Sequence, residues 1–197
     1  TPPATSPTDL LFEIGTEELP AGDLDSAIEQ LNKRVPTLLD ELRLAHGDMH
    51  VMGTPRRLVM HVEKVAPRQP DLEQLVKGPP ADRAFDSFGA PTKAGEGFAR
   101  SKGVSVQDLQ VVEMDGGRYV AVNIRQVGRA AIEVLGEALQ GLIVSLRFDK
   151  SMRWNRTNVY FSRPIRWLLA VLGEQVIPFE YAGVQSGKVT RGLRTIL

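Results

Sequence analysis

The sequence predicts an α+β protein in which antiparallel sheets pack against helices and the chain divides into two lobes. Two long segments repeat apolar residues at three- and four-residue steps, which is typical of helices with one buried face. Shorter segments alternate apolar and polar residues between Gly-, Pro- or Asp-containing turns, which is typical of strands joined by hairpins. A region rich in proline and glycine interrupts this series, so we expect residues 67–127 to form a lobe inserted between 9–66 and 128–197.

The composition narrows the class of protein. The chain has 197 residues, 24 basic and 24 acidic side chains, three histidines and no cysteine. No apolar run reaches the ~18 residues of a membrane-spanning helix, so we expect no membrane contact. The lack of cysteine fits a cytoplasmic location and makes a metal site improbable. The sequence contains no phosphate-loop or nucleophile-elbow motif, so we expect neither a bound cofactor nor catalytic residues in this chain.

The first part of the main lobe should contain one helix and three strands. Residues 1–8 are rich in Pro, Ser and Thr and predict a disordered leader. An apolar stripe predicts a helix at Asp23–Ala45, with Asp23 as its N-cap and a kink or break at Pro36. Alternating patterns predict three strands: Asp9–Gly15, Asp48–Met52 and Arg57–Val65.

The middle lobe should combine a hairpin with short helices. Four prolines between Pro67 and Pro80 predict a linker or a crossing between the lobes. Thr92 is placed to cap a helix at Lys93–Lys102. The turn Asp115-Gly116-Gly117 between β-branched residues is a strong hairpin signal. The other elements expected here are a short helix, a capped turn and two hairpin strands: Ala81–Phe88, Ser105–Leu109, Gln110–Met114 and Arg118–Ile124.

The last part of the chain should return to the main lobe. A clean apolar stripe predicts a second long helix at Arg129–Leu146. Pro164 should end one strand before the next begins, and Gly173-Glu174 should form a tight turn between the last two strands. The strands expected are Asn158–Ser162, Ile165–Leu172 and Gln175–Tyr181.

The largest charge asymmetry lies between Arg147 and Trp167. Up to Arg166 this stretch has six basic side chains against one acid, and it contains both tryptophans of the chain. Clustered arginines can neutralise phosphate, and aromatic rings can stack on unpaired bases. The alternative is a strand whose aromatic rings enter the core while its arginines lie at the rim. Arg56 and Arg57 are adjacent on the turn after Pro55, where they could either bind a phosphate or simply be solvated. The candidate binding residues are Lys150, Arg153, Trp154, Arg156, Arg163, Arg166, Arg56 and Arg57.

Two adjacent acids, Glu17 and Glu18, come just before the first predicted helix. Paired carboxylates suggest a catalytic or metal site, whereas two acids at this position also suit the positive N-terminal end of a helix. Adjacent side chains point in different directions, which is poor geometry for a carboxylate pair. We therefore favour the electrostatic interpretation.

Eight motifs, in order along nearly the whole chain, together resemble the β subunit of the bacterial heterotetrameric glycyl-tRNA synthetase. They are L-L-F-E-I-G-T-E-E-L-P (10–20), T-P-R-R-L (54–58), K-G-P-P (77–80), G-A-P-T-K-A (89–94), G-F-A-R (97–100), K-S-M-R-W (150–154), R-P-I-R-W (163–167) and S-G-K-V-T-R-G (186–192). Asn155 departs from the family, which usually has glycine after the tryptophan of K-S-M-R-W. Family members are several times longer, so the chain resembles their N-terminal part only.

The resemblance implies an enzyme whose chemistry lies outside this region. In such an α2β2 assembly the α subunit would hold ATP, Mg and glycine, while the β subunit would engage tRNA-Gly. The region would then support aminoacylation without an active site of its own, for example by positioning the tRNA. Three roles stay open for the basic residues: tRNA contact, an interface with the α subunit or later β domains, or ion pairs with Glu13, Glu17 and Glu18.

Overall fold

The computed structural model describes residues 6–192, which fold into two compact units. Unit 1 combines the chain up to Gln69 with the chain from Arg129 onward, and unit 2 comprises Pro70–Gly128. Both units contain a sheet and helices, so the predicted α+β class with antiparallel sheets in two lobes is confirmed. Among the described residues, none of the helices has the length and apolar character needed to cross a lipid bilayer.

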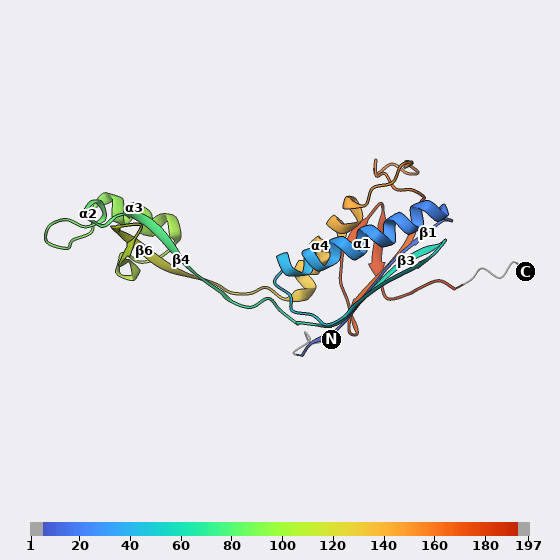
Figure 1. The fold of residues 1–197 in the computed structure, drawn as a ribbon, viewed down its shortest axis with the longest axis horizontal. Helices are drawn as coiled ribbons and strands as arrows, with labels where there is room; N and C mark the ends of the chain where they lie inside the picture. The colour runs from blue at the N-terminus through green and yellow to red at the C-terminus, as the bar shows by residue number, and fades with distance from the viewer. Residues whose placement is uncertain (1–5, 193–197) are drawn as a thin grey trace, which may run out of the picture. The chain divides into compact units, whose positions relative to one another are not determined.

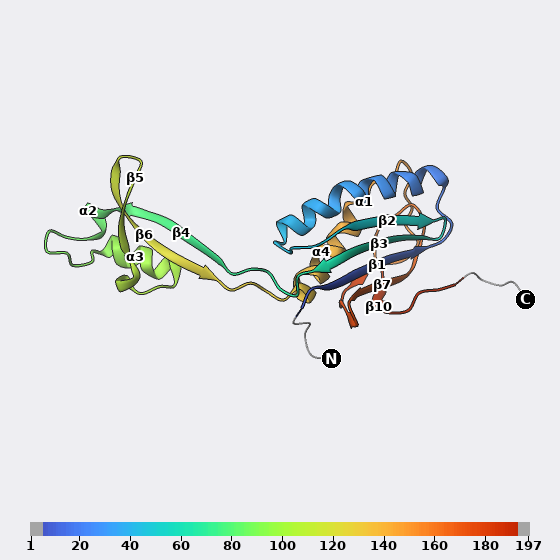
Figure 2. The same ribbon diagram turned by 60° about the horizontal axis from the view of Figure 1, so that its bottom comes forward.

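The sheet of unit 1 is organised around strand β1, which lies between strands from both ends of the chain. β1 pairs antiparallel with β3 on one side and with β7 on the other. The order is β2-β3-β1-β7-β10-β9, with β8 pairing to β7, and only the β10–β7 pairing is parallel (Figure 2). The strands are β1 (Thr8–Thr16), β2 (Met49–Thr54), β3 (Arg57–Val65), β7 (Ile165–Leu172), β8 (Gln175–Val176), β9 (Glu180–Tyr181) and β10 (Val184–Gly187).

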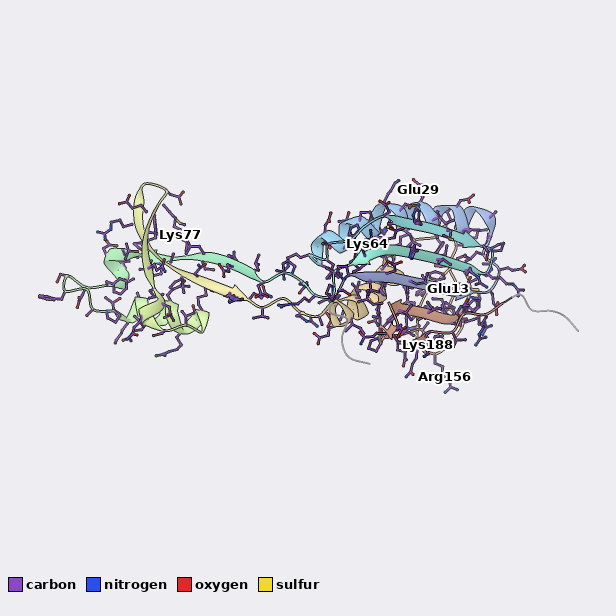
Figure 3. All side chains as sticks on the ribbon, turned by 90° about the horizontal axis from the view of Figure 1, so that it is seen from below. Glu13, Glu29, Lys64, Lys77, Arg156 and Lys188 are labelled. Carbon is purple, nitrogen blue, oxygen red and sulfur yellow. The ribbon has the colours of Figure 1, made fainter. Side chains whose placement is uncertain are left out.

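Helices α1 (Ala21–Glu41) and α4 (Ala131–Ser145) cover one face of this sheet (Figure 1). Side chains alternate across a strand, so Leu10, Phe12 and Ile14 of β1 point together into the core under the helices, where each is at most 1% exposed. The opposite, open face carries Leu11, Glu13 and Gly15 of the same strand. This open face has no helix on it within residues 6–192 (Figure 3).

Helix α1 corrects three details of the sequence prediction. It starts directly after Pro20 and no side chain caps it, so Asp23 lies in the first turn and is not the N-cap. Of the kink or break predicted at Pro36, the break is wrong: the helix continues, because the neighbouring Val35 and Leu39 are buried and packing outweighs the missing hydrogen bond. The helix ends at Glu41, four residues before the predicted end at Ala45.

Unit 2 is a three-stranded antiparallel sheet in the order β4-β6-β5 with two short helices. Its elements are β4 (Leu72–Pro80), α2 (Ala81–Ala84), α3 (Lys93–Lys102), the 3₁₀ turn η1 (Val106–Asp108), β5 (Gln110–Met114) and β6 (Gly117–Gln126). Thr92 caps α3 through its side chain, and the Asp-Gly hairpin joins β5 to β6, so both predictions are confirmed. A small core gathers between the helices and the sheet: Ala84, Ala99, Leu109, Val120 and Val122.

Other predicted elements were wrong in part. The proline-rich segment 67–80 contains strand β4, because its last prolines lie at a register shift after Lys77 where the ladder is interrupted anyway. Asn158–Ser162 is not a strand, since Asn158 adopts a left-handed φ of 62°. The predicted strand Gln175–Tyr181 is split into β8 and β9 around Pro178. The expected leader 1–8 falls partly outside the described residues, and Thr8 already belongs to β1.

Candidate functional site

The predicted basic stretch forms a closed connection between α4 and β7, which we call the basic loop (residues 147–164). Met152 and Phe161 pair through two backbone hydrogen bonds of 2.8 and 3.3 Å, which bring the two arms of the loop together. The Phe161 side chain is 1% exposed and meets the ring of Phe148 edge-on at 4.8 Å. Aromatic packing therefore anchors the base of a loop that has no regular secondary structure.

Further contacts hold the inner side of the basic loop. Trp154 packs against the main core of unit 1. The Asn155 amide donates a hydrogen bond of 2.7 Å to the carbonyl oxygen of Ala182, and its oxygen accepts one of 3.0 Å from the backbone N–H of Thr157. Asn155, the departure from the family motif, thus ties the loop to the segment after β9. The buried Ser162 hydroxyl donates to Asp23 on α1.

The outer side of the basic loop carries cations that form no ion pair with the acids of residues 6–192. Lys150, Arg153 and Arg156 are exposed, and Arg163 is half-buried. The Arg153 guanidinium stacks over the Tyr160 ring at 4.6 Å and donates a 2.6 Å hydrogen bond to the neutral side chain of Asn158. None of the four cations forms an ion pair with an acid in the described part of the chain. The loop therefore presents net positive charge beside an exposed aromatic ring.

The other predicted arginines are ion-paired within unit 1. Arg56 lies 3.2 Å from Glu18, Arg57 lies 3.6 Å from Glu13, and Arg166 donates to Glu17. Intramolecular ion pairs with these acids were one of the three roles that the sequence left open. The candidate residues thus separate into a paired group on the sheet and an unpaired group on the basic loop. Glu17 and Glu18 each contact a different arginine, as expected for adjacent side chains that diverge.

A second cluster lies on the open face of the sheet around Glu13 (Figure 3). An ion pair between an arginine and Glu13 was among the roles that the sequence left open, but the contacts of Trp167 and Thr190 with Glu13 were not predicted. The Glu13 side chain is only 7% exposed, although it lies on that face. The Trp167 indole N–H donates to it at 2.5 Å, and the Thr190 hydroxyl donates at 2.7 Å. Arg57 reaches the Thr190 hydroxyl at 3.1 Å and the carbonyl oxygen of Arg191. We call these five residues the Glu13 cluster.

The Trp167 ring is the flat centre of the Glu13 cluster. The guanidinium groups of Arg57 and Arg191 lie 5.7 and 5.6 Å from its centroid, within the range of cation–π attraction. The ring lies across Gly15 so closely that a Cβ atom there would come within 3.0 Å of three ring atoms. Gly15 is therefore required by the approach of the ring.

The Glu13 cluster joins four of the eight motifs on which the family resemblance rests. Glu13, Arg57, Trp167 and Thr190 come from four different motifs that are far apart in the sequence. Sequence reasoning missed these contacts because they join distant segments: β1 pairs with β3 and β7, and Thr190, which follows β10, reaches Glu13 through its side chain. Among the described residues, no group of three or more His, Asp or Glu side chains is arranged to hold a metal ion.

Comparisons with known proteins match the family that the eight sequence motifs resemble. The sequence model of the family described as "Glycyl-tRNA synthetase beta subunit" matches residues 10–197. "Glycine--tRNA ligase, chloroplastic/mitochondrial 2" of Arabidopsis thaliana is 47% identical over 95% of this chain and 18% of the relative. "Glycine--tRNA ligase beta subunit" of Desulforamulus reducens and that of Moorella thermoacetica are each 47% identical over 94% of this chain and 27% of the relative.

These matches first define a class: the relatives are components of aminoacyl-tRNA synthetases, the ligases that join amino acids to tRNA. Within that class, the chain belongs to the glycyl-tRNA synthetase beta subunit family. The chain spans about a quarter of the length of the bacterial relatives.

Proposed function

We propose that this chain serves as the N-terminal region of the β subunit of a glycine-tRNA ligase and contacts tRNA-Gly through the basic loop. The observation that carries this proposal is the set of exposed, unpaired cations Lys150, Arg153 and Arg156 on a loop anchored to the core. Because no acid in residues 6–192 pairs with them, their charge is available to phosphate oxygens. The Tyr160 ring beside Arg153 adds a flat surface on which an unpaired base can stack.

In this proposal the chain contributes binding and positioning, while the chemistry lies in the partner. The α subunit of an α2β2 assembly holds ATP, Mg and glycine and forms the activated amino acid. This region, including unit 2 as an inserted lobe, binds no cofactor of its own and works in the cytoplasm. Holding the end of the tRNA near the activated glycine speeds the transfer by supplying orientation instead of new functional groups.

The paired arginines are weaker candidates for phosphate contact. Arg57 already donates to Thr190 and Arg191 and lies beside Glu13, so a phosphate would have to displace existing bonds. Arg56 and Arg166 are half-exposed, but each has a carboxylate neighbour that offsets its charge. The proposal therefore assigns RNA contact to the basic loop and leaves the paired group a structural role.

A second function for the same loop is assembly. Met152 is 41% exposed and Tyr160 is 54% exposed, next to the stacked Arg153. Methionine, tyrosine and arginine are enriched at protein–protein interfaces. In this alternative the loop packs against the α subunit or a later β domain and does not touch RNA.

Glycylation by the complete ligase tests the proposal. The Arg153→Ala/Arg156→Ala variant should lower kcat/KM for tRNA-Gly by about tenfold or more. A hydrogen bond to a charged group is worth about 1.5–3 kcal/mol and screening reduces this at exposed sites, so two lost contacts should together cost at least the roughly 1.4 kcal/mol that a factor of ten requires. Glycine-dependent ATP–pyrophosphate exchange, which needs no tRNA, should stay unchanged. The matched control is Arg56→Ala/Arg166→Ala, which removes the same charge from unit 1 and should leave kcat/KM within a few fold.

Two results would point elsewhere. If the loop variant loses the α subunit on gel filtration, the loop serves assembly. If both double variants reduce kcat/KM equally, the distinction between paired and unpaired arginines has no functional meaning.

A further inference from the structure

Unit 2 contains an exposed aromatic side chain on a loop that is fixed without it. Phe88 is 94% exposed and lies between α2 and α3. This connection projects away from the sheet of unit 2 in both ribbon views (Figures 1 and 2). An aromatic side chain can bury about 150–250 Å² when it finds a partner surface, and Phe88 uses almost none of that within the described chain.

The loop that carries Phe88 has a defined backbone. The Asp86 carboxylate accepts hydrogen bonds from the backbone N–H groups of Phe88 at 2.9 Å and Ala90 at 2.8 Å. The backbone of Asp86 bonds again to Ala90 at 2.8 Å, and Gly89 adopts the left-handed φ of 80° that the turn requires. Because none of these contacts uses the Phe88 ring, the loop displays a rigid anchor at little entropic cost on binding.

An open groove of about 980 Å³ lies beside this loop. Its apolar walls come from the end of β4, the start of the loop, the edge strand β5 and β6: Pro80, Phe85, Val111 and Tyr119. A projecting aromatic ring next to a half-apolar groove is the arrangement found at the centre of protein interfaces, where one anchor inserts and the neighbouring hollow receives a side chain in return.

The charges around the groove select the kind of partner. Asp82 and Asp86 line it against a single cation, Arg118. Neither acid forms an ion pair with a cation in the described part of unit 2. An excess of acid repels the phosphates of RNA and is complementary to a protein surface with basic side chains at its rim. The groove therefore differs from the basic loop of unit 1, which carries unpaired cations.

We infer that the Phe88 loop and this groove form a docking surface for a protein that presents an apolar pocket with a basic rim. Resting on the proposed function, that partner is the α subunit of the ligase. Unit 1 then contacts RNA through the basic loop, and unit 2 contacts protein. Neither role requires the other surface.

A thiol footprint tests this inference, because these 197 residues contain no cysteine and peptide mapping separates a thiol introduced here from any in the rest of the subunit. Ser87→Cys places a thiol in the groove beside Phe88 without removing the ring. In the complete β subunit, maleimide labelling of this cysteine, read by peptide mapping, should be lost on adding the α subunit and should persist with tRNA-Gly alone. A cysteine at Val127, which is 65% exposed in the same unit, should stay labelled in both cases.

Affinity provides a second readout. Phe88→Ala should weaken binding of the complete subunit to the α subunit by about tenfold or more, as expected for an interface anchor. Asp82→Lys should also weaken binding to the α subunit, and the loss of affinity should be larger at low salt than at high salt. Binding of tRNA-Gly should be unchanged in both variants. Because Phe88 is exposed, its truncation leaves the fold of unit 2 intact, and Val127→Ala is the matched control.

Several outcomes would overturn the inference. Protection of the groove by tRNA would make Phe88 a base-stacking residue, and protection that depends on subunit concentration alone would assign the groove to a second copy. Unchanged labelling and unchanged affinity would show that the groove is not an interface. If the unmodified subunit neither binds the α subunit nor supports glycylation, the proposed function fails, and this result is distinct from a failure of the groove alone.

Discussion

Substitution of Gly15 by alanine should destabilise unit 1 through a single contact. The added Cβ would lie less than 3.0 Å from Cδ2, Cε2 and Cε3 of Trp167. To regain ordinary contacts of 3.4–4 Å, the ring has to move away from β1. That movement pulls the indole N–H away from Glu13, to which it donates at 2.5 Å.

The magnitude follows from two effects. Forcing an extra methyl group into a packed site costs about 1–3 kcal/mol. Losing a hydrogen bond to a charged, buried carboxylate costs about 1.5–3 kcal/mol. If the Trp167 ring moves away, the steric overlap falls but the hydrogen bond to Glu13 is lost, and if the ring stays, the overlap remains. The free energy of unfolding of unit 1 should therefore fall by about 2–4 kcal/mol.

The assay can report unit 1 alone. Both tryptophans, Trp154 and Trp167, lie in unit 1, so tryptophan fluorescence during urea denaturation follows that unit. The control is Gly141→Ala on α4, where a Cβ meets nothing within 4 Å. It should stabilise the unit by about 0.5–1 kcal/mol, because alanine favours the helix.

A double-mutant cycle isolates the contact. In a Trp167→Ala background the ring is absent, and Gly15→Ala should cost about 0.5 kcal/mol or less. Trp154 still provides the signal. A cost that is the same in both backgrounds, or a cost near zero in the unmodified chain, would refute the reasoning.

Three further predictions concern stability. Thr92→Ala removes the N-cap of α3 and should destabilise that helix by about 1 kcal/mol, which amide hydrogen exchange would detect as faster exchange in its first turn. Arg166→Ala breaks an exposed pair with Glu17 and should change the stability of unit 1 by about 1 kcal/mol or less, with a smaller effect at high salt; a larger loss would mean that the pair is structurally essential. The pKa of Asp9 lies below its ordinary value of 3.8, chiefly because the backbone N–H of Lys64 donates to its carboxylate. The resulting stabilisation is complete above the pKa that Asp9 has in the unfolded chain, and it is lost as the pH falls through the lower pKa of the folded state. Denaturation curves measured from pH 6 to pH 3 should therefore show a smaller loss of stability for Asp9→Asn than for the unmodified chain.

Local signals in the sequence predicted many of the elements. Ile165–Leu172 is a strand with the predicted bounds, and the helix after Thr92 starts and ends as predicted. Each of these elements depends on side chains within a few residues: an apolar pattern ended by a turn, or a hydroxyl that caps a helix. The Asp-Gly hairpin was predictable for the same reason.

Local signals failed where distant contacts decide the structure. The aromatic residues around Tyr160 look like a strand in sequence, yet Phe161 reaches the core from an irregular loop and Asn158 is left-handed. Pro36 predicts a kink or a break in the helix, and the break is absent because burial of its neighbours keeps α1 continuous. In both cases tertiary packing outweighs the local preference.

The site was predictable in its residues but not in its pairing. Charge and aromatic content identified the basic loop and its cations. The pairing of Arg56 with Glu18 and of Arg166 with Glu17 spans 38 and 149 residues, and no local pattern reveals which cations have such partners. The division into paired and unpaired arginines, on which the proposed function depends, therefore required the structure.

The salt dependence of tRNA binding tests that division most directly. Affinity of the chain for tRNA-Gly should be measured at several salt concentrations for the unmodified chain and for Arg153→Ala/Arg156→Ala. Each lost phosphate contact reduces the magnitude of the slope of log K against log salt by about 0.7 for a single strand and by about 0.9 for a B-form duplex. The slope of the double variant should therefore be less steep by about 1.4–1.8. An unchanged slope in a folded variant would contradict the claim that the basic loop binds the tRNA backbone.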